Sequence, residues 1–374
     1  MNKKDELCKR ARSLWLSLDC NLIEVEKIYR EAWNKSSDFT TTTKKQRVSC
    51  NEAGEKLALI LLQSGRAEEA NQILKVLGYT CRLAEIVFNY PTNESIATDK
   101  ISSDIQSPPC RIYDDFFRKK DLEILSSVFQ DPKASYWEGH NYQVEPPSPY
   151  FSYLIPLIGS ESEYGFVGEL VRRIQKQVSE WRPAVLKATY CEMWAHNRPH
   201  ASGHQLHFDS DNEGAGGIRN PIVSTVVYLT DTGAPSLITN QRLISRSLAD
   251  QGWMILPGKN RLAVFDGKVL HGVIPGKGES RSHRVTVMFA FWKEIQVRDG
   301  DHPGAARLFP LDNRDWSQKL REAKRVDECA ADNNLTTTIN SRPIHLNKVY
   351  ETLDGEPWKR MMGLPDYGQV FQGF

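Results

Sequence analysis

The sequence lacks the cysteine patterns that build disulfide frameworks or thiolate metal sites. Its 374 residues include seven cysteines, an odd number, and no two of them form a Cys-x-x-Cys pair. Small secreted scaffolds use an even set of paired cysteines, and structural zinc sites use closely spaced thiolates. The scattered cysteines therefore predict reduced thiols in an intracellular protein of the cytoplasm or nucleus.

Long apolar segments and an excess of charge of one sign are also missing. The longest apolar runs, at Leu57–Leu62 and Val285–Phe291, are far shorter than the ~20 residues of a membrane helix. The first residues, Met1 to Glu6, have no apolar core of the kind found in secretory signals. Forty-eight basic and 47 acidic residues leave a net charge of +1, without the basic footprint that binds nucleic acid. These absences predict a soluble chain that binds neither membranes nor nucleic acid.

The sequence does have the composition of a folded globular protein. Hydrophobic residues make up 40% and charged residues 25% of the chain, which is enough to build a proper core. The length exceeds that of a typical single domain, so two domains are predicted. The composition becomes polar and proline-containing between residues 91 and 112, which is typical of a linker. We predict an α-helical domain over residues 1–107 and a second domain over residues 108–374.

The first hundred residues have helical periodicity. Apolar residues from Leu22 to Trp33 recur at three- and four-residue steps. A pair of helices is predicted at Leu57–Leu62 and Ala67–Leu77, with Ser64-Gly65 as the turn between them. The segment Leu57–Gly78 resembles one tetratricopeptide hairpin, a unit that usually needs about three copies to form a core. An ordinary helical hairpin packed on the larger domain is an equal alternative.

Beyond residue 112 the pattern changes to short strands. They are rich in β-branched and aromatic residues and are separated by Gly, Pro and Asn turns. Many short strands at regular spacing favour a β-sandwich or jelly roll. Helices predicted at Tyr113–Phe129 and Tyr164–Trp181 pack on one outer side, and Trp316–Glu328 is also predicted to be helical. The predicted fold class is α+β, a jelly roll preceded by a helical domain. The predicted strands are Lys187–Trp194, Pro221–Leu229, Ser236–Thr239, Trp253–Leu256, Arg261–Phe265 and Arg284–Trp292.

Three residues, His207, Asp209 and His271, form a candidate metal site. In a strand, residues i and i+2 face the same side, so His207 and Asp209 can hold one ion while Phe208 turns away. His271 supplies a third ligand from another strand. Two imidazoles and one carboxylate on one face of an octahedral ion leave positions open, which suits an iron(II) that binds a chelating co-substrate together with oxygen.

Arg284 is the candidate anchor for such a co-substrate. It begins the apolar strand Arg284–Trp292, shortly after His271. A dicarboxylate that chelates iron at one end needs its far carboxylate held by a fixed cation. Arginine does this with two parallel hydrogen bonds and stays charged, whereas lysine is only a point charge.

Together these motifs resemble the 2-oxoglutarate and iron(II)-dependent oxygenase superfamily, and especially its prolyl 4-hydroxylase-like branch. The resemblance implies a double-stranded β-helix, Fe(II) held by the triad, and 2-oxoglutarate anchored by Arg284. It also implies O2 as oxidant, succinate and CO2 as products, and ascorbate as an accessory reductant. It covers about residues 187–292 and includes Tyr190, His207-x-Asp209, the turn 233–238, the block Gly258–Pro275 and Arg284.

Several neighbouring residues have open roles. Arg281 is an alternative anchor because it has the spacing from His271 that is usual in the family, but Arg284 is favoured since it opens the strand. Tyr190 and Thr286 either hydrogen-bond the co-substrate or only line the barrel. His204 would face away from the metal in an extended strand, so we predict a loop or surface role for it.

The implied activity is hydroxylation, or another two-electron oxidation, of a C–H bond in a protein side chain or a small metabolite. Asp209 favours hydroxylation over halogenation, because related halogenases replace this carboxylate with Ala or Gly. A collagen substrate is disfavoured by the missing secretory signal. Two alternatives are a non-catalytic helical-repeat interaction protein with a relic barrel and a cupin-like metal enzyme that does not use 2-oxoglutarate.

Overall fold

The chain folds into an α+β structure of helices and three sheets, seen in a computed structural model. Residues 92–107 of the predicted linker, the predicted loop 332–338 and Arg281 lie outside the described residues. None of the helices in the described part combines the length and apolar character that a bilayer crossing needs. The structure describes residues 3–17, 20–35, 44–91 (44–50 by backbone only), 108–144, 147–159, 163–211, 217–279, 282–300, 304–323, 341–354 and 368–374.

The largest sheet has seven strands in the order β12-β3-β4-β11-β6-β9-β2. Strand β11 lies at its centre and pairs antiparallel with β4 and β6. Every residue of β11 after His283 is buried, because this strand is covered on both faces. The strands are β2 (Cys110–Tyr113), β3 (Tyr153–Pro156), β4 (Tyr190–Pro199), β6 (Val223–Tyr228), β9 (Arg261–Asp266), β11 (His283–Trp292) and β12 (Arg307–Leu308).

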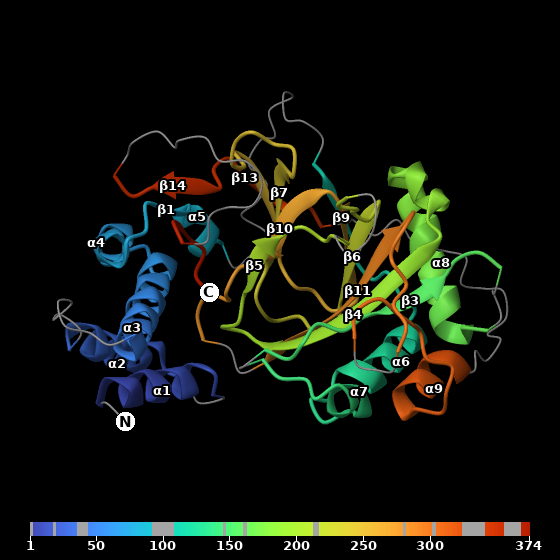
Figure 1. Cartoon of the computed structure of the whole chain (residues 1–374), viewed down its shortest axis with the longest axis horizontal. Helices are drawn as coiled ribbons and strands as arrows, with labels where there is room; N and C mark the ends of the chain where they lie inside the picture. The colour runs from blue at the N-terminus through green and yellow to red at the C-terminus, as the bar shows by residue number, and fades with distance from the viewer. Residues whose placement is uncertain are drawn as a thin grey trace.

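A second sheet of five strands, in the order β13-β8-β7-β10-β5, packs face to face with the first. One hydrophobic cluster joins them: Trp194 and Met288 of the larger sheet share it with Ile238 and Trp253 of the smaller one. Figure 1 shows β5, β10 and β7 on one side of this sandwich and β4, β11 and β6 on the other. The strands are β5 (His204–His207), β7 (Ser236–Arg242), β8 (Gly252–Ile255), β10 (Val269–Val273) and β13 (Ile344–Leu346).

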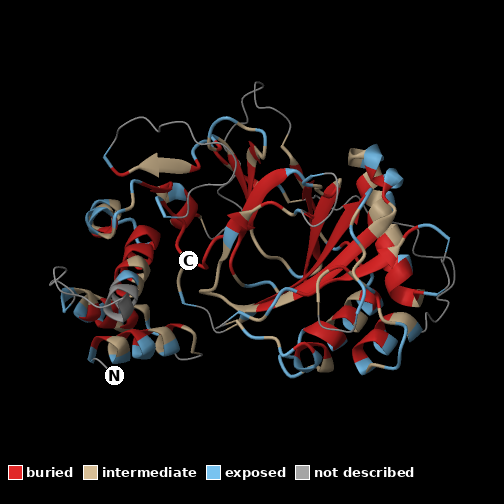
Figure 2. Ribbon diagram, in the orientation of Figure 1, coloured by how far each residue is buried: buried red, intermediate tan, exposed pale blue. Residues whose placement is uncertain are grey.

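Helices cover the outer face of the seven-stranded sheet. Val287 and Phe289, which point away from the second sheet, share a buried cluster with Phe129, Leu170 and Ile174. Figure 2 shows this layer buried on its inner side and exposed outside. The helices are α6 (Lys119–Phe129), α7 (Ser135–Gly139), α8 (Gly165–Trp181) and α9 (Asp315–Glu322), and a 3-10 helix, Pro183–Lys187, leads into β4.

The N-terminal helices lie against the outer face of the five-stranded sheet. Leu206, Met254 and Leu270 of that face belong to the same buried cluster as Leu57 and Leu74. A small third sheet, β14-β1-β15, joins this region to the end of the chain. The elements are α1 (Lys3–Trp15), α2 (Leu22–Asn34), α3 (Lys44–Gln63), α4 (Ala67–Leu77), α5 (Glu85–Phe88), β1 (Cys81–Leu83), β14 (Tyr350–Thr352) and β15 (Val370–Phe371).

Most of the predicted elements are present, with several local corrections. Strand β4 continues to Pro199, beyond the predicted end at Trp194, and α9 ends at Glu322, before the predicted end at Glu328. Tyr113 does not begin a helix but ends β2, because residues 110–113 pair with β9. Lys187 ends the 3-10 helix, so the next strand begins only at Tyr190. Strand β7 continues to Arg242, beyond the predicted end at Thr239. The division into domains at residue 107 stays a prediction.

Replacing Phe371 by alanine tests whether the C-terminal residues stabilise the helical region. Phe371 is 2% exposed, packs with its ring centroid 5.4 Å from that of Tyr79 and 6.0 Å from that of Phe88, and lies on β15 beside β1. We expect the free energy of unfolding to fall by about 3–5 kcal/mol, as for other buried Phe→Ala changes. Urea denaturation measures the loss. Ile244→Ala is the control, since Ile244 is 88% exposed and its change should cost little. Equal stability of both variants would contradict this packing.

Candidate metal centre and its cavity

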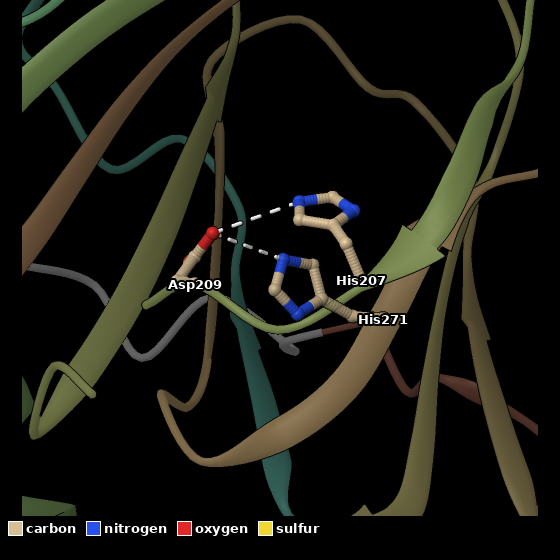
Figure 3. Close-up of side chains that lie close together, drawn as sticks. All are labelled: His207, Asp209 and His271. Atoms are coloured by element: carbon tan, nitrogen blue, oxygen red, sulfur yellow. Dashed lines mark ion pairs between the residues drawn. The ribbon is translucent and has the colours of Figure 1, made fainter. Parts of the chain in front are cut away.

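His207, Asp209 and His271 converge between the two sheets. His207 ends β5, Asp209 follows two residues later, and His271 lies on β10 directly opposite His207. Both imidazole Nε2 atoms face Asp209 Oδ1, at 3.6 Å from His207 and 3.5 Å from His271 (Figure 3). Two ligands bound at about 2.1 Å to one ion can be at most about 4.2 Å apart. Asp209 is therefore close enough to each histidine to share a metal ion with it, and the three ligand atoms all lie within 4.8 Å of one another.

Backbone carbonyls fix the orientation of both imidazoles. The Nδ1 atom of His207 lies 2.7 Å from the carbonyl oxygen of Gln205, and that of His271 lies 3.0 Å from the carbonyl oxygen of Val269. A carbonyl can only accept, so each Nδ1 must carry the proton. Each Nε2 then points its lone pair toward the shared centre, which is the form that binds a metal.

Asp209 is held in a matching way. Its Oδ2 accepts a hydrogen bond from Ser224 Oγ at 2.6 Å, which leaves Oδ1 directed at the two histidines. Burial alone would raise the pKa of Asp209, but the two histidines hold that pKa well below its usual value. In turn, burial favours neutral His271, whereas the Asp209 carboxylate raises the pKa of His271 above its ordinary value. The site is an ionised acid facing two imidazoles, which attracts a cation.

The triad opens into a cavity that both sheets line. Arg284 is buried at one end of it, with its guanidinium 3.4 Å from the carbonyl oxygen of Ala234. Burial lowers the pKa of Arg284 to about 10, so the group is still charged at neutral pH. Among the described residues, no carboxylate forms an ion pair with it. The close approach of Gly233 fixes its place, because a Cβ on Gly233, at φ +126, would lie 2.4 Å from Arg284 Cβ.

Thr286 and Tyr190, the two further residues predicted as possible co-substrate ligands, lie at different distances from Arg284. Thr286 lies two residues from Arg284 on the inward side of β11, fully buried, and its hydroxyl has no hydrogen-bond partner. Tyr190 pairs with Trp292, eight residues along β11 from Arg284, which is about 26 Å along a strand. Arg284 and Tyr190 cannot both contact one five-carbon diacid across this distance, so the geometry argues against a co-substrate role for Tyr190.

His204 lines the cavity, so the loop or surface role predicted for it is wrong. His207 pairs with His271 and His204 pairs with Val273, which places three residue steps on β5 against two on β10. This bulge restores His204 to the same face as His207, and their ring centroids are 4.5 Å apart. The expectation failed because it assumed a regular strand.

Sequence reasoning missed three further residues of the cavity. Trp194 and His196 on β4 and Ser224 on β6 all line it. Burial lowers the pKa of His196 well below its usual value, so this imidazole is neutral. The alternation along β4 carried a signal, since Cys191, Met193 and Ala195 are the residues that face the helices. Once this face is known, the even positions must point into the sandwich.

No family model and no curated protein matches the chain. Solved structures with partial similarity include a Pseudomonas putida prolyl-4-hydroxylase, at 14% identity and TM-score 0.32, covering 55% of this chain and 96% of that one. A viral collagen prolyl hydroxylase from Paramecium Bursaria Chlorella virus-1 is 14% identical, with a TM-score of 0.28, and the match covers 49% of this chain and 96% of that one. A Burkholderia pseudomallei oxidoreductase of the 2OG-Fe(II) oxygenase family is 11% identical, with a TM-score of 0.31, and the match covers 54% of this chain and 88% of that one. These are structures of the type that the motifs resemble, and with TM-scores this low the function proposed below depends on the site geometry.

Alanine in place of His207 should abolish metal binding. We expect an affinity loss for Mn(II) or Fe(II) of more than about 100-fold, because one of three ligands is removed and even an outer partner of a ligand is worth 10- to 100-fold. His204→Ala is the matched control, since it removes a neighbouring imidazole that is outside the triad. Anaerobic titration calorimetry measures both. If His204→Ala loses the metal and His207→Ala keeps it, the assignment of ligands is incorrect.

Proposed function

We propose that the protein is a 2-oxoglutarate- and Fe(II)-dependent dioxygenase that hydroxylates a C–H bond of a protein side chain or a small metabolite. The reaction would take up O2 and convert 2-oxoglutarate to succinate and CO2. One observation carries the proposal: a two-histidine, one-carboxylate triad shares a cavity with a buried arginine that has no acidic partner among the described residues.

The donor set fits Fe(II). Imidazole nitrogens suit iron, and three protein ligands on one face leave open positions. When bound there, iron would supply sites for a chelating keto acid and for O2. His207, Asp209 and His271 would hold it, with Ser224 and two backbone carbonyls keeping the ligand atoms aimed inward.

Arg284 would bind the far carboxylate of 2-oxoglutarate. A buried guanidinium without an anion is costly, so a site of this kind is expected to receive one. The hydroxyl of Thr286, buried beside it without a partner, is a second donor for the same group. Arg284 and the triad line one cavity, so a diacid that chelates the metal could reach the guanidinium.

The finer architecture is part of the same proposal. Two sheets that face each other, antiparallel except for the pair β12–β3, with the two histidines on β5 and β10, support a jelly-roll catalytic domain over residues 108–374 and a helical domain over residues 1–107. An intracellular location also stays a proposal. The two alternative functions are disfavoured by Arg284: neither a cupin-like enzyme without 2-oxoglutarate nor a relic barrel explains an unpaired buried cation beside an intact triad.

Succinate release tests the activity directly. Purified protein with Fe(II), ascorbate, O2 and 2-oxoglutarate should form succinate above a no-enzyme control, and His207→Ala should not. Under anaerobic conditions, the metal and 2-oxoglutarate together should give a weak visible charge-transfer band. Loss of both signals in the wild-type protein would reject the proposal and favour the relic interpretation.

Arg284→Met and Arg281→Met decide which arginine anchors the co-substrate. The Arg284 variant should lose about 10- to 100-fold in affinity for 2-oxoglutarate, because it removes a charge-assisted hydrogen-bond pair. The Arg281 variant serves as the control and should bind normally. Calorimetry with Mn(II) in place of iron measures binding without turnover. An unchanged affinity in Arg284→Met would instead support a metal enzyme that does not use 2-oxoglutarate.

A further inference from the structure

A buried carboxyl group, Glu192, lies between the two sheets, two residues along β4 from Trp194, which lines the cavity, and far along the strands from Arg284. Along β11 the inward-facing residues run Arg284, Thr286, Met288, Ala290 and Trp292, and β4 pairs with them in register, so that Glu192 is opposite Ala290. Arg284 and Ala290 are six residues apart, or about 20 Å along the strand. The interior between the sheets is therefore cationic at one end and acidic at the other.

The metal centre lies beside the acidic end. Ala290 also pairs with Ser224 on β6, so Glu192, Ala290 and Ser224 form one row across three strands. Two strand spacings separate the ends of this row by about 10 Å. Ser224 holds Asp209, and Ala290 between them has only a methyl group. Glu192 is thus on the same face of the sheet as the serine that holds Asp209, and the Asp209 carboxylate is near enough to raise its pKa.

Three aromatic side chains surround Glu192. Tyr150 donates a hydrogen bond to Glu192 Oε1 at 3.3 Å, and its ring lies edge-on to Trp194, with centroids 6.1 Å apart. Trp292 is the diagonal neighbour of Glu192 on β11, and its indole N–H interacts with the carboxyl group and lowers the pKa of Glu192. Tyr150 is 51% exposed, whereas Glu192 is only 5% exposed. The aromatic ring of Tyr150 therefore places this end of the interior next to solvent.

Glu192 has no cation of its own. Its donors are Ser152, at 2.5 Å, and Tyr150, both to Oε1, together with the indole N–H of Trp292. All three are neutral, and none of the ion pairs in the described part of the chain involves Glu192. Burial, with a contribution from Asp209, raises the pKa of Glu192 to about 7. Burying an acid in this way is unfavourable unless a partner arrives.

We propose that Glu192, with Tyr150, Trp194 and Trp292, binds an organic cation, so that the substrate carries an alkylammonium or guanidinium group near the carbon that is oxidised. Carboxylates and aromatic faces are the groups that hold such cations. This inference rests on the proposed oxygenase function for its meaning, but cation binding can be measured without turnover. The same chemistry can come from a free amine or from a Lys or Arg residue of a protein.

Matched cationic and neutral probes test the site. N-acetyl-lysine amide and N-acetyl-norleucine amide form one pair, and the arginine and citrulline derivatives form the other. Each is also placed at the centre of a nine-residue Gly-Ala peptide. Calorimetry with protein loaded with Mn(II) and 2-oxoglutarate should give at least about tenfold tighter binding of a cationic member. If the cationic member binds more tightly among the amino-acid derivatives, the substrate is a small molecule. If it does so only among the nine-residue peptides, the substrate is a protein.

Glu192→Gln should remove the preference, because the amide keeps an acceptor for Ser152 and Tyr150 but loses the charge. Glu180→Gln, on the exposed end of α8, is the charge-matched control and should keep it. Ser152→Ala separates structure from binding. It removes the hydrogen bond from Ser152 to Glu192 and leaves the carboxylate, so it should lower stability and keep the preference for the cationic probe. If Ser152→Ala and Glu192→Gln lose binding equally, Glu192 only holds the loop at Ser152.

The outcomes distinguish this inference from the proposed function. Binding of 2-oxoglutarate and succinate formation with no cationic preference, or with a preference that survives in Glu192→Gln, would overturn the inference alone. Failure of every probe to bind would overturn it as well. A cationic preference in a protein that binds no 2-oxoglutarate would support the cation site and reject the oxygenase.

Discussion

The two hydrogen bonds from imidazole Nδ1 to backbone carbonyl are the constraint on which the candidate site depends. A free histidine side chain can present either nitrogen, and a rotated ring would point its lone pair into the sheet. Here the carbonyls of Gln205 and Val269 lie two residues before their histidines, so the same local arrangement occurs on both strands. Because β5 and β10 pair with His207 opposite His271, two local constraints produce one shared centre.

The second organising feature is the distribution of charge inside the sandwich. Strand β11 supplies a straight row of inward positions, with a cation at Arg284 and small or apolar residues toward Trp292. The acids are contributed by other elements, Asp209 after β5 and Glu192 on β4. A ligand with negative ends is attracted to the first region, and a cationic ligand to the second. Under the proposed function, this separation would let the co-substrate and the substrate reach one metal ion from opposite sides.

The sequence was most informative where a pattern depends on a single strand. The triad was identified from the alternation of residues and the motif, and Arg284 from its place at the start of an apolar strand, and the structure brings all four into one cavity. What escaped prediction depends on pairing between strands. The bulge that turns His204 inward is a property of two strands together, and the row Glu192–Ala290–Ser224 exists only once three strands are in register. Strand β2 was missed because its four residues are stabilised by β9 rather than by their own pattern.

The helical region packs against the face of the five-stranded sheet that lies behind the candidate metal ligands. Leu206 and Leu270 immediately precede His207 and His271, point to the opposite face of the sheet, and are fully buried in the cluster that contains Leu57 and Leu74 of α3 and α4. In a closely packed cluster, displacement of one side chain moves its neighbours. A shift of these helices would therefore press on the residues adjacent to both ligands. The packing of the helices is therefore linked, through Leu206 and Leu270, to the two strands that carry His207 and His271.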